Sequence, residues 1–231
     1  MDSYATYWTF MLPAMALVLL AQLWVKSTYG KWGRVQNSAG LTGGQAAQRL
    51  LQASGLSDVN LERVPGQLTD HFDPRTRSLR LSDGVAQQPS VASLAIAAHE
   101  IGHALQDRAG YLPMRLRAAI VPVVSIGSYL GWILIFLGLA IQSLDIAGLG
   151  LVAFSLGTVF ALATLPVELN ASARARELLS RSGLVQTAEE NAGVRAMLTA
   201  AAFTYVAALA AAVLQLLYYA MLVASLGRRR R

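Results

Sequence analysis

The chain has 231 residues, of which 55% are hydrophobic and only 14% are charged. Because soluble globular domains carry about a quarter of charged residues, this composition excludes an ordinary soluble globule and indicates a membrane protein. The formal net charge of +6 comes mostly from arginine near the ends of apolar runs, which is typical of a membrane orientation signal; we expect no nucleic-acid partner. The chain contains no cysteine, so disulfides are excluded and any metal must be bound by histidine and carboxylate groups.

The first apolar run extends from about Tyr4 to Val25. Asp2 precedes it and Lys26 follows it, which is the reverse of the charge order of a cleaved secretory signal. We therefore expect residues 1–25 to form an uncleaved transmembrane anchor whose N-terminus lies outside the cell.

The next segment, residues 26–117, is the polar part of the chain. A helix is expected to begin after Thr42, and the alternating patterns of Val59–Val64 and Ser78–Ser82 predict two short strands, with a turn at Asp70–Pro74 between them. So small a sheet must pack on a helix to be stable. Two interpretations stay open: a plain scaffold, or an edge strand to which an extended peptide adds as a further strand.

The motif H-E-x-x-H follows on a predicted helix that Ser90 caps and Gly110 ends. Positions four apart project from one face of a helix, so His99 and His103 can bind one metal ion while Glu100 lies beside its open position. The alternative is a polar edge on an ordinary helix. We favour a metal because these groups stand on an otherwise nearly apolar helix and would be costly to bury without a ligand.

Two more apolar runs, separated by a minimal break at Asp145, predict a transmembrane hairpin over residues 118–165, followed by a cytoplasmic helix over 166–200. Basic residues flank both outer ends of the hairpin: Arg115, Arg117, Arg174, Arg176 and Arg181. The positive-inside rule therefore places the polar segment in the cytoplasm.

The final segment, residues 201–231, combines an apolar run with a basic tail. If this run crosses the membrane, Arg228–Arg231 lie outside, against the positive-inside rule, and a re-entrant course is the alternative. The expected fold class is a mainly α membrane protein with about four transmembrane helices and a small cytoplasmic α+β zincin-like metallopeptidase domain. The sequence does not indicate an oligomeric state.

A catalytic zinc usually has three protein ligands, and here the third must be His71, an aspartate or a glutamate. Glu168 is the best candidate, because a carboxylate just past an apolar span is costly unless it is paired or bound. The alternative is an interfacial glutamate paired with Arg174 or Arg176. Ser172, one turn further on, is placed to hydrogen-bond a ligand.

These motifs resemble the YugP-type membrane zinc metallopeptidases, relatives of the HtpX-type gluzincins. The resemblance rests on Ala-His-Glu-Ile-Gly-His-Ala from Ala98, Pro-Val-Glu-x-x-Ala-Ser from Pro166, and Asp-His-Phe-Asp-Pro from Asp70. It covers nearly the whole chain and implies that His99, His103 and Glu168 bind zinc, that Glu100 is the catalytic carboxylate, and that the protein acts in proteolysis. The HtpX type usually carries aspartate where Ser172 stands.

For the chemistry we expect Glu100 to take a proton from a water activated by zinc and to pass it to the leaving amine. His71 is nominated as the donor to the oxyanion, with Tyr205 and Arg174 less favoured; the alternative is a buried structural His71. Asp107, one turn after the second motif histidine, could orient that imidazole, although a solvated aspartate is the competing interpretation.

The expected function is a zinc-dependent metalloendopeptidase of the cell (inner) membrane with its catalytic site facing the cytoplasm. Its substrates would be peptides or membrane proteins cut near the lipid bilayer. One alternative is a non-catalytic membrane scaffold or chaperone-like protein with a structural zinc. A zinc transporter is disfavoured, because between Ala118 and Leu165 the only residue charged at neutral pH is Asp145.

Overall fold

The computed structural model describes residues 3–228, so that Asp2 and Arg229–Arg231 of the basic tail lie outside the described residues. The chain divides into two compact units. The helical unit comprises residues 1–21, 115–166 and 204–231. The mixed unit comprises residues 22–114 and 167–203.

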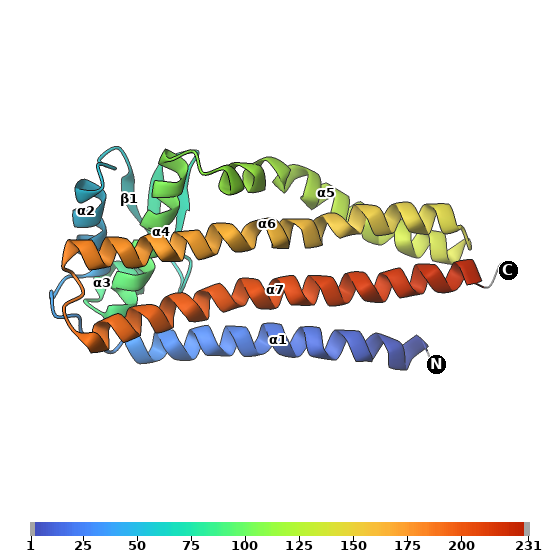
Figure 1. The fold of residues 1–231 in the computed structure, drawn as a ribbon, viewed down its shortest axis with the longest axis horizontal. Coiled ribbons are helices and arrows are strands. Elements are labelled where there is room, and N and C mark those ends of the chain that lie inside the picture. Colours follow the sequence, from blue (N-terminus) through green and yellow to red (C-terminus); the bar gives the residue numbers. More distant parts are fainter. Residues whose placement is uncertain (1–2, 229–231) are drawn as a thin grey trace. The chain divides into compact units, whose positions relative to one another are not determined.

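Four long helices supply the helical unit: α1 (Ser3–Trp32), α5 (Leu112–Ala140), α6 (Leu144–Ser182) and α7 (Ala188–Arg228) (Figure 1). All four are long and apolar enough to cross a membrane, which agrees with the expected number of transmembrane helices. α6 and α7 run without interruption through positions 165/166 and 200/201, where the sequence analysis placed segment boundaries.

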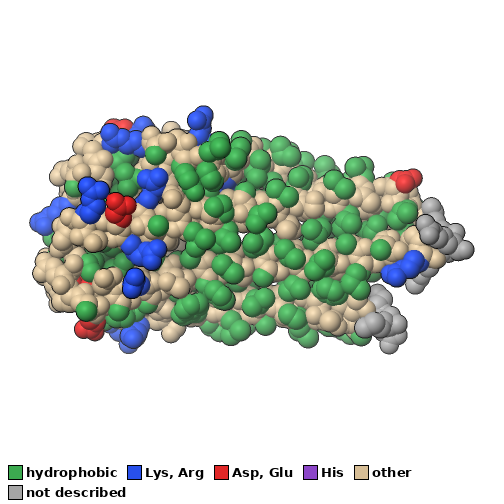
Figure 2. All heavy atoms as spheres, in the orientation of Figure 1, with side chains coloured by type: hydrophobic (Ala, Val, Ile, Leu, Met, Phe, Trp, Pro, Cys, Tyr) green, Lys and Arg blue, Asp and Glu red, His purple; other side chains and the backbone are tan. Residues whose placement is uncertain are grey.

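The helical unit buries few of its apolar side chains. Its buried cluster draws on all four helices and consists of Met11, Ile135, Ala147, Tyr218, Tyr219, Val223 and Leu226. Many other large apolar residues are exposed, among them Tyr129 at 70% and Val152 at 67%, and Figure 2 shows hydrophobic side chains spread widely over the visible face. A soluble protein rarely exposes so much apolar surface, so this unit is built to contact lipid.

Glycines bring α5 and α6 into close contact within the helical unit. A Cβ atom added to Gly131 would lie 2.8 Å from the Cα of Phe154, and one added to Gly138 would lie 2.7 Å from the Cα of Ala147. Both distances are too short for any side chain, so the two backbones meet directly at these positions. Small residues serve this purpose in membrane helix pairs.

A three-stranded sheet lies in the mixed unit, in the order β1-β3-β2. β3 (Ser78–Ser82) is the central strand. It pairs in parallel with β1 (Asn60–Val64) and antiparallel with β2 (His71–Asp73). The strands expected near residues 59–64 and 78–82 are thus confirmed. The expectation of a simple turn at Asp70–Pro74 was wrong, because its first residues form the edge strand β2.

Three helices cover this sheet: α2 (Gly43–Ala53), α3 (Asp83–Gln87) and α4 (Val91–Arg108). The side chain of Thr42 caps α2, as the sequence analysis anticipated. α4 is buried along most of its length and packs against β2 and β3. The sheet therefore does pack on the helix that carries the H-E-x-x-H motif.

We predict that Gly138→Leu destabilises the protein, by at least the roughly 1–3 kcal/mol that overpacking costs, because the leucine would collide with the backbone of α6. The matched control is Gly148→Leu, since nothing lies within 4 Å of a Cβ at Gly148. Thermal unfolding of both variants in the same detergent measures the difference. Equal melting temperatures would show that the α5–α6 contact contributes nothing.

Candidate metal centre

α4 presents the two motif histidines from a rigid position. Ser90 accepts a hydrogen bond from the backbone N–H of Ser93 at the start of the helix, and Gly110 adopts a positive φ of 61° just past its end. His99 and His103 stand one turn apart between these ends, and their ring centroids are 4.9 Å apart. The helix predicted from the sequence is confirmed with both its cap and its stop.

Glu168 on α6 completes a group of three possible metal ligands. Its Oε2 lies 3.3 Å from Nε2 of His99 and 3.5 Å from Nε2 of His103, and one ligand atom of each residue lies within 4.8 Å of the others. Two atoms bound to one zinc ion at about 2.0–2.1 Å in a tetrahedron are separated by roughly 3.3 Å. The two distances from Glu168 therefore match the separation of ligands around a tetrahedral zinc ion.

The three groups are also poorly hydrated. The side chain of Glu168 is 2% exposed and those of both histidines are 12% exposed. A carboxylate so deeply buried needs a cation or strong hydrogen bonds. Arg174, which the sequence analysis offered as an alternative partner for Glu168, donates from its Nε to the Oδ1 of Asn170 at 2.8 Å.

A glycine inside the motif allows the ligand-bearing helices to meet. A Cβ atom on Gly102 would lie 2.5 Å from the backbone oxygen of Ala171 on α6. Any side chain at this position would push α4 away from α6. Since His99 and His103 flank Gly102 and Glu168 lies one turn before Ala171, this contact sets the distance between the ligands.

Glu100 lies beside the ligand group and is not part of it. Its side chain is buried, with 8% of the residue exposed, and its Oε2 accepts a hydrogen bond of 3.1 Å from the backbone N–H of Phe72 on β2. Burial raises the pKa of the nearby Asp70 above its usual value despite hydrogen bonds from Ser82, and the negative charge of Glu100 acts in the same direction.

Each motif histidine has a hydrogen-bond partner for its second nitrogen. Nδ1 of His99 lies 3.2 Å from Oγ of Ser172, as the sequence analysis anticipated. Nδ1 of His103 lies 3.0 Å from Oε1 of Gln106. Sequence reasoning missed Gln106 and nominated Asp107 instead; the spacing of three residues, which puts both side chains on one helix face, was the available signal.

The pKa of His103 lies above that of an ordinary histidine in the metal-free protein. Burial alone would lower this pKa, but the hydrogen bond to Glu168 and the negative charges of Glu100 and Glu168 outweigh it. A metal ligand must be deprotonated, so protons compete with a metal at a higher pH here than at an isolated histidine.

His71 lies on the exposed face of β2, so the alternative of a buried structural histidine was wrong. Its Nδ1–H donates to the backbone oxygen of Thr69 at 2.9 Å, and its Nε2 lies 3.5 Å from Nη1 of Arg80. Neither bond joins it to the metal ligands. Its neighbour Phe72, however, touches Glu100 through the backbone. The catalytic role of His71 stays a prediction.

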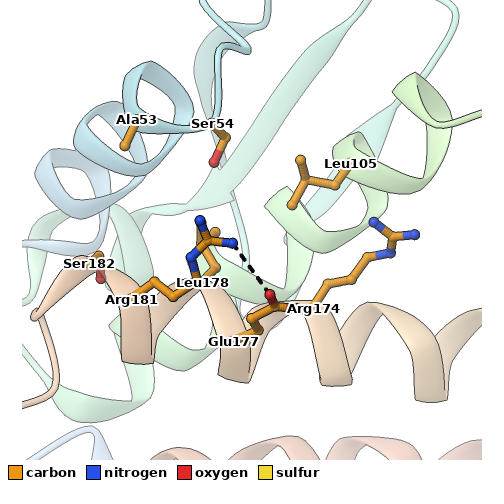
Figure 3. A pocket seen from close by; sticks show the side chains of 8 residues that line it. All are labelled: Ala53, Ser54, Leu105, Arg174, Glu177, Leu178, Arg181 and Ser182. Carbon is orange, nitrogen blue, oxygen red and sulfur yellow. Dashed lines mark hydrogen bonds and ion pairs between the residues drawn. The ribbon is translucent and has the colours of Figure 1, made fainter.

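The mixed unit also contains a separate pocket of about 440 Å³ (Figure 3). Its walls come from the end of α2, from Leu105 on α4 and from α6: Ala53, Ser54, Arg174, Glu177, Leu178, Arg181 and Ser182. Figure 3 shows Arg181 paired with Glu177 and Arg174 extending beside Leu105. None of the three candidate ligands lines this pocket, so it is distinct from the metal centre.

Comparison with known proteins identifies the family. A family model described as "Putative neutral zinc metallopeptidase" matches residues 7–224. The protein named "Putative membrane protease YugP" from Bacillus subtilis (strain 168) is 43% identical over 209 residues, which cover 90% of this chain and 92% of that relative. No solved structure matches the chain. The resemblance found from the motifs is thus confirmed, and the chain belongs to the family of putative neutral zinc metallopeptidases.

Proposed function

We propose that this protein is a membrane-embedded, zinc-dependent metalloendopeptidase that hydrolyses peptide bonds near the cytoplasmic surface of the cell membrane. The observation that carries the proposal is the meeting of His99, His103 and Glu168 around one point, with Glu100 buried beside them. Family membership supports the same chemistry. Membrane-protein quality control is the biological role that we propose for it.

Zinc is the metal that this donor set fits best. Two imidazoles and one carboxylate leave a fourth position of a tetrahedron open, as in catalytic rather than structural zinc sites. When bound, zinc lowers the pKa of a coordinated water to about 7 and polarises the carbonyl of the scissile bond.

Glu100 is the proposed general base. One of its oxygens accepts the backbone N–H of Phe72, which fixes the carboxylate and leaves the other oxygen for a water molecule. In the proposed reaction Glu100 removes a proton from the attacking water, the water oxygen bonds to the carbonyl carbon, and Glu100 then protonates the amine nitrogen as the C–N bond breaks. The carboxylate is thereby returned to its starting state.

Strand β2 is the proposed binding element for the substrate. It is an edge strand that pairs with β3 on one side only, and its residue Phe72 touches Glu100. An extended peptide that adds to this edge would place its backbone next to the general base. This favours the edge-strand interpretation of the polar segment over that of a plain scaffold.

We further propose that the substrates are membrane proteins or peptides held close to the bilayer. Glu168 follows the apolar stretch of α6 by only a few residues, at about 1.5 Å of rise per residue. Arginines flank the apolar stretches on the side of the polar segment, which by the positive-inside rule is the cytoplasmic side.

The competing function is a non-catalytic scaffold with a structural zinc site. Both functions require zinc binding, and they differ in whether Glu100 acts on a water molecule. Substitution of Glu100 therefore separates them.

We expect Glu100→Gln to lower kcat for peptide cleavage by about 10²–10⁴-fold, the contribution typical of a general acid–base group. The amide can still accept the N–H of Phe72, so the local structure and the zinc affinity should be kept. Peptide cleavage with purified protein in detergent, together with zinc titration, measures both. Undiminished cleavage would exclude the proposed mechanism and favour the scaffold.

Removing Glu168 should weaken zinc binding directly. Glu168→Ala is expected to raise the zinc Kd by more than the roughly 10–100-fold that loss of an outer hydrogen-bond partner costs. The matched control is Glu177→Ala on the same helix, because the side chain of Glu177 is 68% exposed and pairs only with Arg181 among the ion pairs described. Competition with a chelator gives both constants, and equal values would rule out Glu168 as a ligand.

The predicted role of His71 can be checked by comparing two variants. If its imidazole donates to the oxyanion, His71→Ala should lower kcat about 10²–10³-fold with an unchanged zinc Kd. Arg80→Met is the control for the sheet, since it leaves the imidazole in place but removes its contact with Arg80 together with the ion pairs of Arg80 to Glu62 and Asp73. Equal losses of activity in the two variants would contradict a catalytic role and assign the effect to the sheet.

A further inference from the structure

Gln106 is the most completely bonded polar side chain around the metal centre. The residue is 0% exposed. Its Oε1 lies 3.0 Å from Nδ1 of His103, and its Nε2 donates to the backbone oxygen of Val167 at 2.7 Å and to Oδ1 of Asn170 at 3.0 Å. Both N–H groups and the carbonyl of this amide are therefore used, as a buried amide requires.

The direction of each of these hydrogen bonds follows from two groups, one of which can only accept and the other only donate. The backbone oxygen of Val167 can only accept, and the guanidinium of Arg174 can only donate. Since Nε of Arg174 lies 2.8 Å from the amide oxygen of Asn170, that oxygen is an acceptor. Both acceptors face the same end of the Gln106 amide, which must therefore be its NH₂ group.

The same reasoning sets the proton on the imidazole. With its NH₂ group turned towards α6, Gln106 presents its carbonyl oxygen to His103. That oxygen can only accept, so Nδ1 of His103 carries a proton. In the neutral imidazole the lone pair of Nε2 therefore faces Glu168, where the metal is proposed to bind in place of the proton that the two groups otherwise share.

We propose that Gln106 is the positioning residue of the metal centre. It holds His103 in the tautomer and ring orientation that bind a metal, and it joins that ring to the segment of α6 that carries the third ligand. Its two acceptors, Val167 and Asn170, stand on either side of Glu168 in the sequence. This inference rests on the metal centre of the proposed function.

The hydrogen-bond partner of His99 does not fix the tautomer of its imidazole. Nδ1 of His99 faces the hydroxyl of Ser172, which can donate or accept and so does not select a tautomer. The hydrogen bond with Gln106 thus selects the tautomer of His103, whereas the one with Ser172 does not select that of His99. We therefore expect loss of the Gln106 contacts to lower the affinity for a metal.

The test is the zinc Kd of the full-length protein in detergent, measured by competition with a chelator. Gln106→Met keeps the length and packing of the side chain and removes its hydrogen bonds, so we expect the Kd to rise about 10–100-fold, as for loss of other outer partners of a metal ligand. We also expect the visible absorption spectrum of the cobalt(II)-loaded variant to differ from that of the unsubstituted protein. A purely structural glutamine would leave both unchanged.

Asp107→Asn is the matched control, because Asp107 is the adjacent residue of α4 and its side chain has no hydrogen bond or ion pair described in the structure. It should leave the zinc Kd and the cobalt spectrum as they are. An unchanged Kd and spectrum in a folded Gln106→Met variant would overturn the proposal.

Should Gln106→Met fail to fold, Arg174→Met decides the question. Arg174 lies on the wall of the pocket in Figure 3 and fixes the amide of Asn170 from there. Loss of Arg174 frees the amide of Asn170 to turn, so we expect the zinc Kd to rise, but by less than in Gln106→Met. An unchanged Kd would overturn the proposal.

These measurements do not depend on proteolysis. Zinc binding without peptide cleavage in the unsubstituted protein would refute the proposed function and leave the role of Gln106 standing. Absence of zinc binding in that protein would refute both.

Discussion

The close approach of α4 and α6 is the contact on which the rest of the candidate site depends. Two imidazoles come from one helix and a carboxylate from the other, and all three side chains are largely buried around one point. Gly102 permits this approach because the backbone of Ala171 occupies the space that a side chain would need. Glycine at this position is therefore a geometric requirement of the candidate metal centre.

The sheet contributes to the same centre by another route. β2 is short and lies at an edge, yet its backbone supplies the N–H that holds Glu100. Asp70, the residue just before this strand, accepts hydrogen bonds from the N–H and the hydroxyl of Ser82 at the end of β3 and so ties β2 to β3. The segment Asp70–Pro74, which the sequence analysis expected to be a turn, thus supports the proposed general base.

Local patterns were predictable from the sequence, and contacts between distant segments were not. The spacing of His99 and His103 depends on helix geometry alone, and the cap at Ser90 and the stop at Gly110 are local as well. Glu168 was identified because a carboxylate beside an apolar span is costly, which is also a local argument. Its distance from the histidines needed the structure.

The features that were missed have physical reasons. A strand of three residues is too short to show an alternating pattern, so β2 was taken for a turn. α6 passes through Pro166 and continues to Ser182, because a change from apolar to polar composition does not by itself end a helix. Gln106 was overlooked because its bonds to α6 join distant parts of the chain, and only its three-residue spacing from His103 is visible in the sequence.

The use of an amide rather than a carboxylate behind His103 follows from its surroundings. Glu100 and Glu168 already place two carboxylates near this imidazole, and together with its hydrogen bonds they keep its pKa above the ordinary value. A third negative charge would raise the pKa further and strengthen the competition of protons with a metal. The hydrogen bond to the neutral Gln106 also raises this pKa, but it is the smallest of the causes that act on His103. The NH₂ group of the amide can at the same time bind α6, which a carboxylate could not do. The chemistry of glutamine thus meets both demands of a position that faces a metal ligand on one side and a helix backbone on the other.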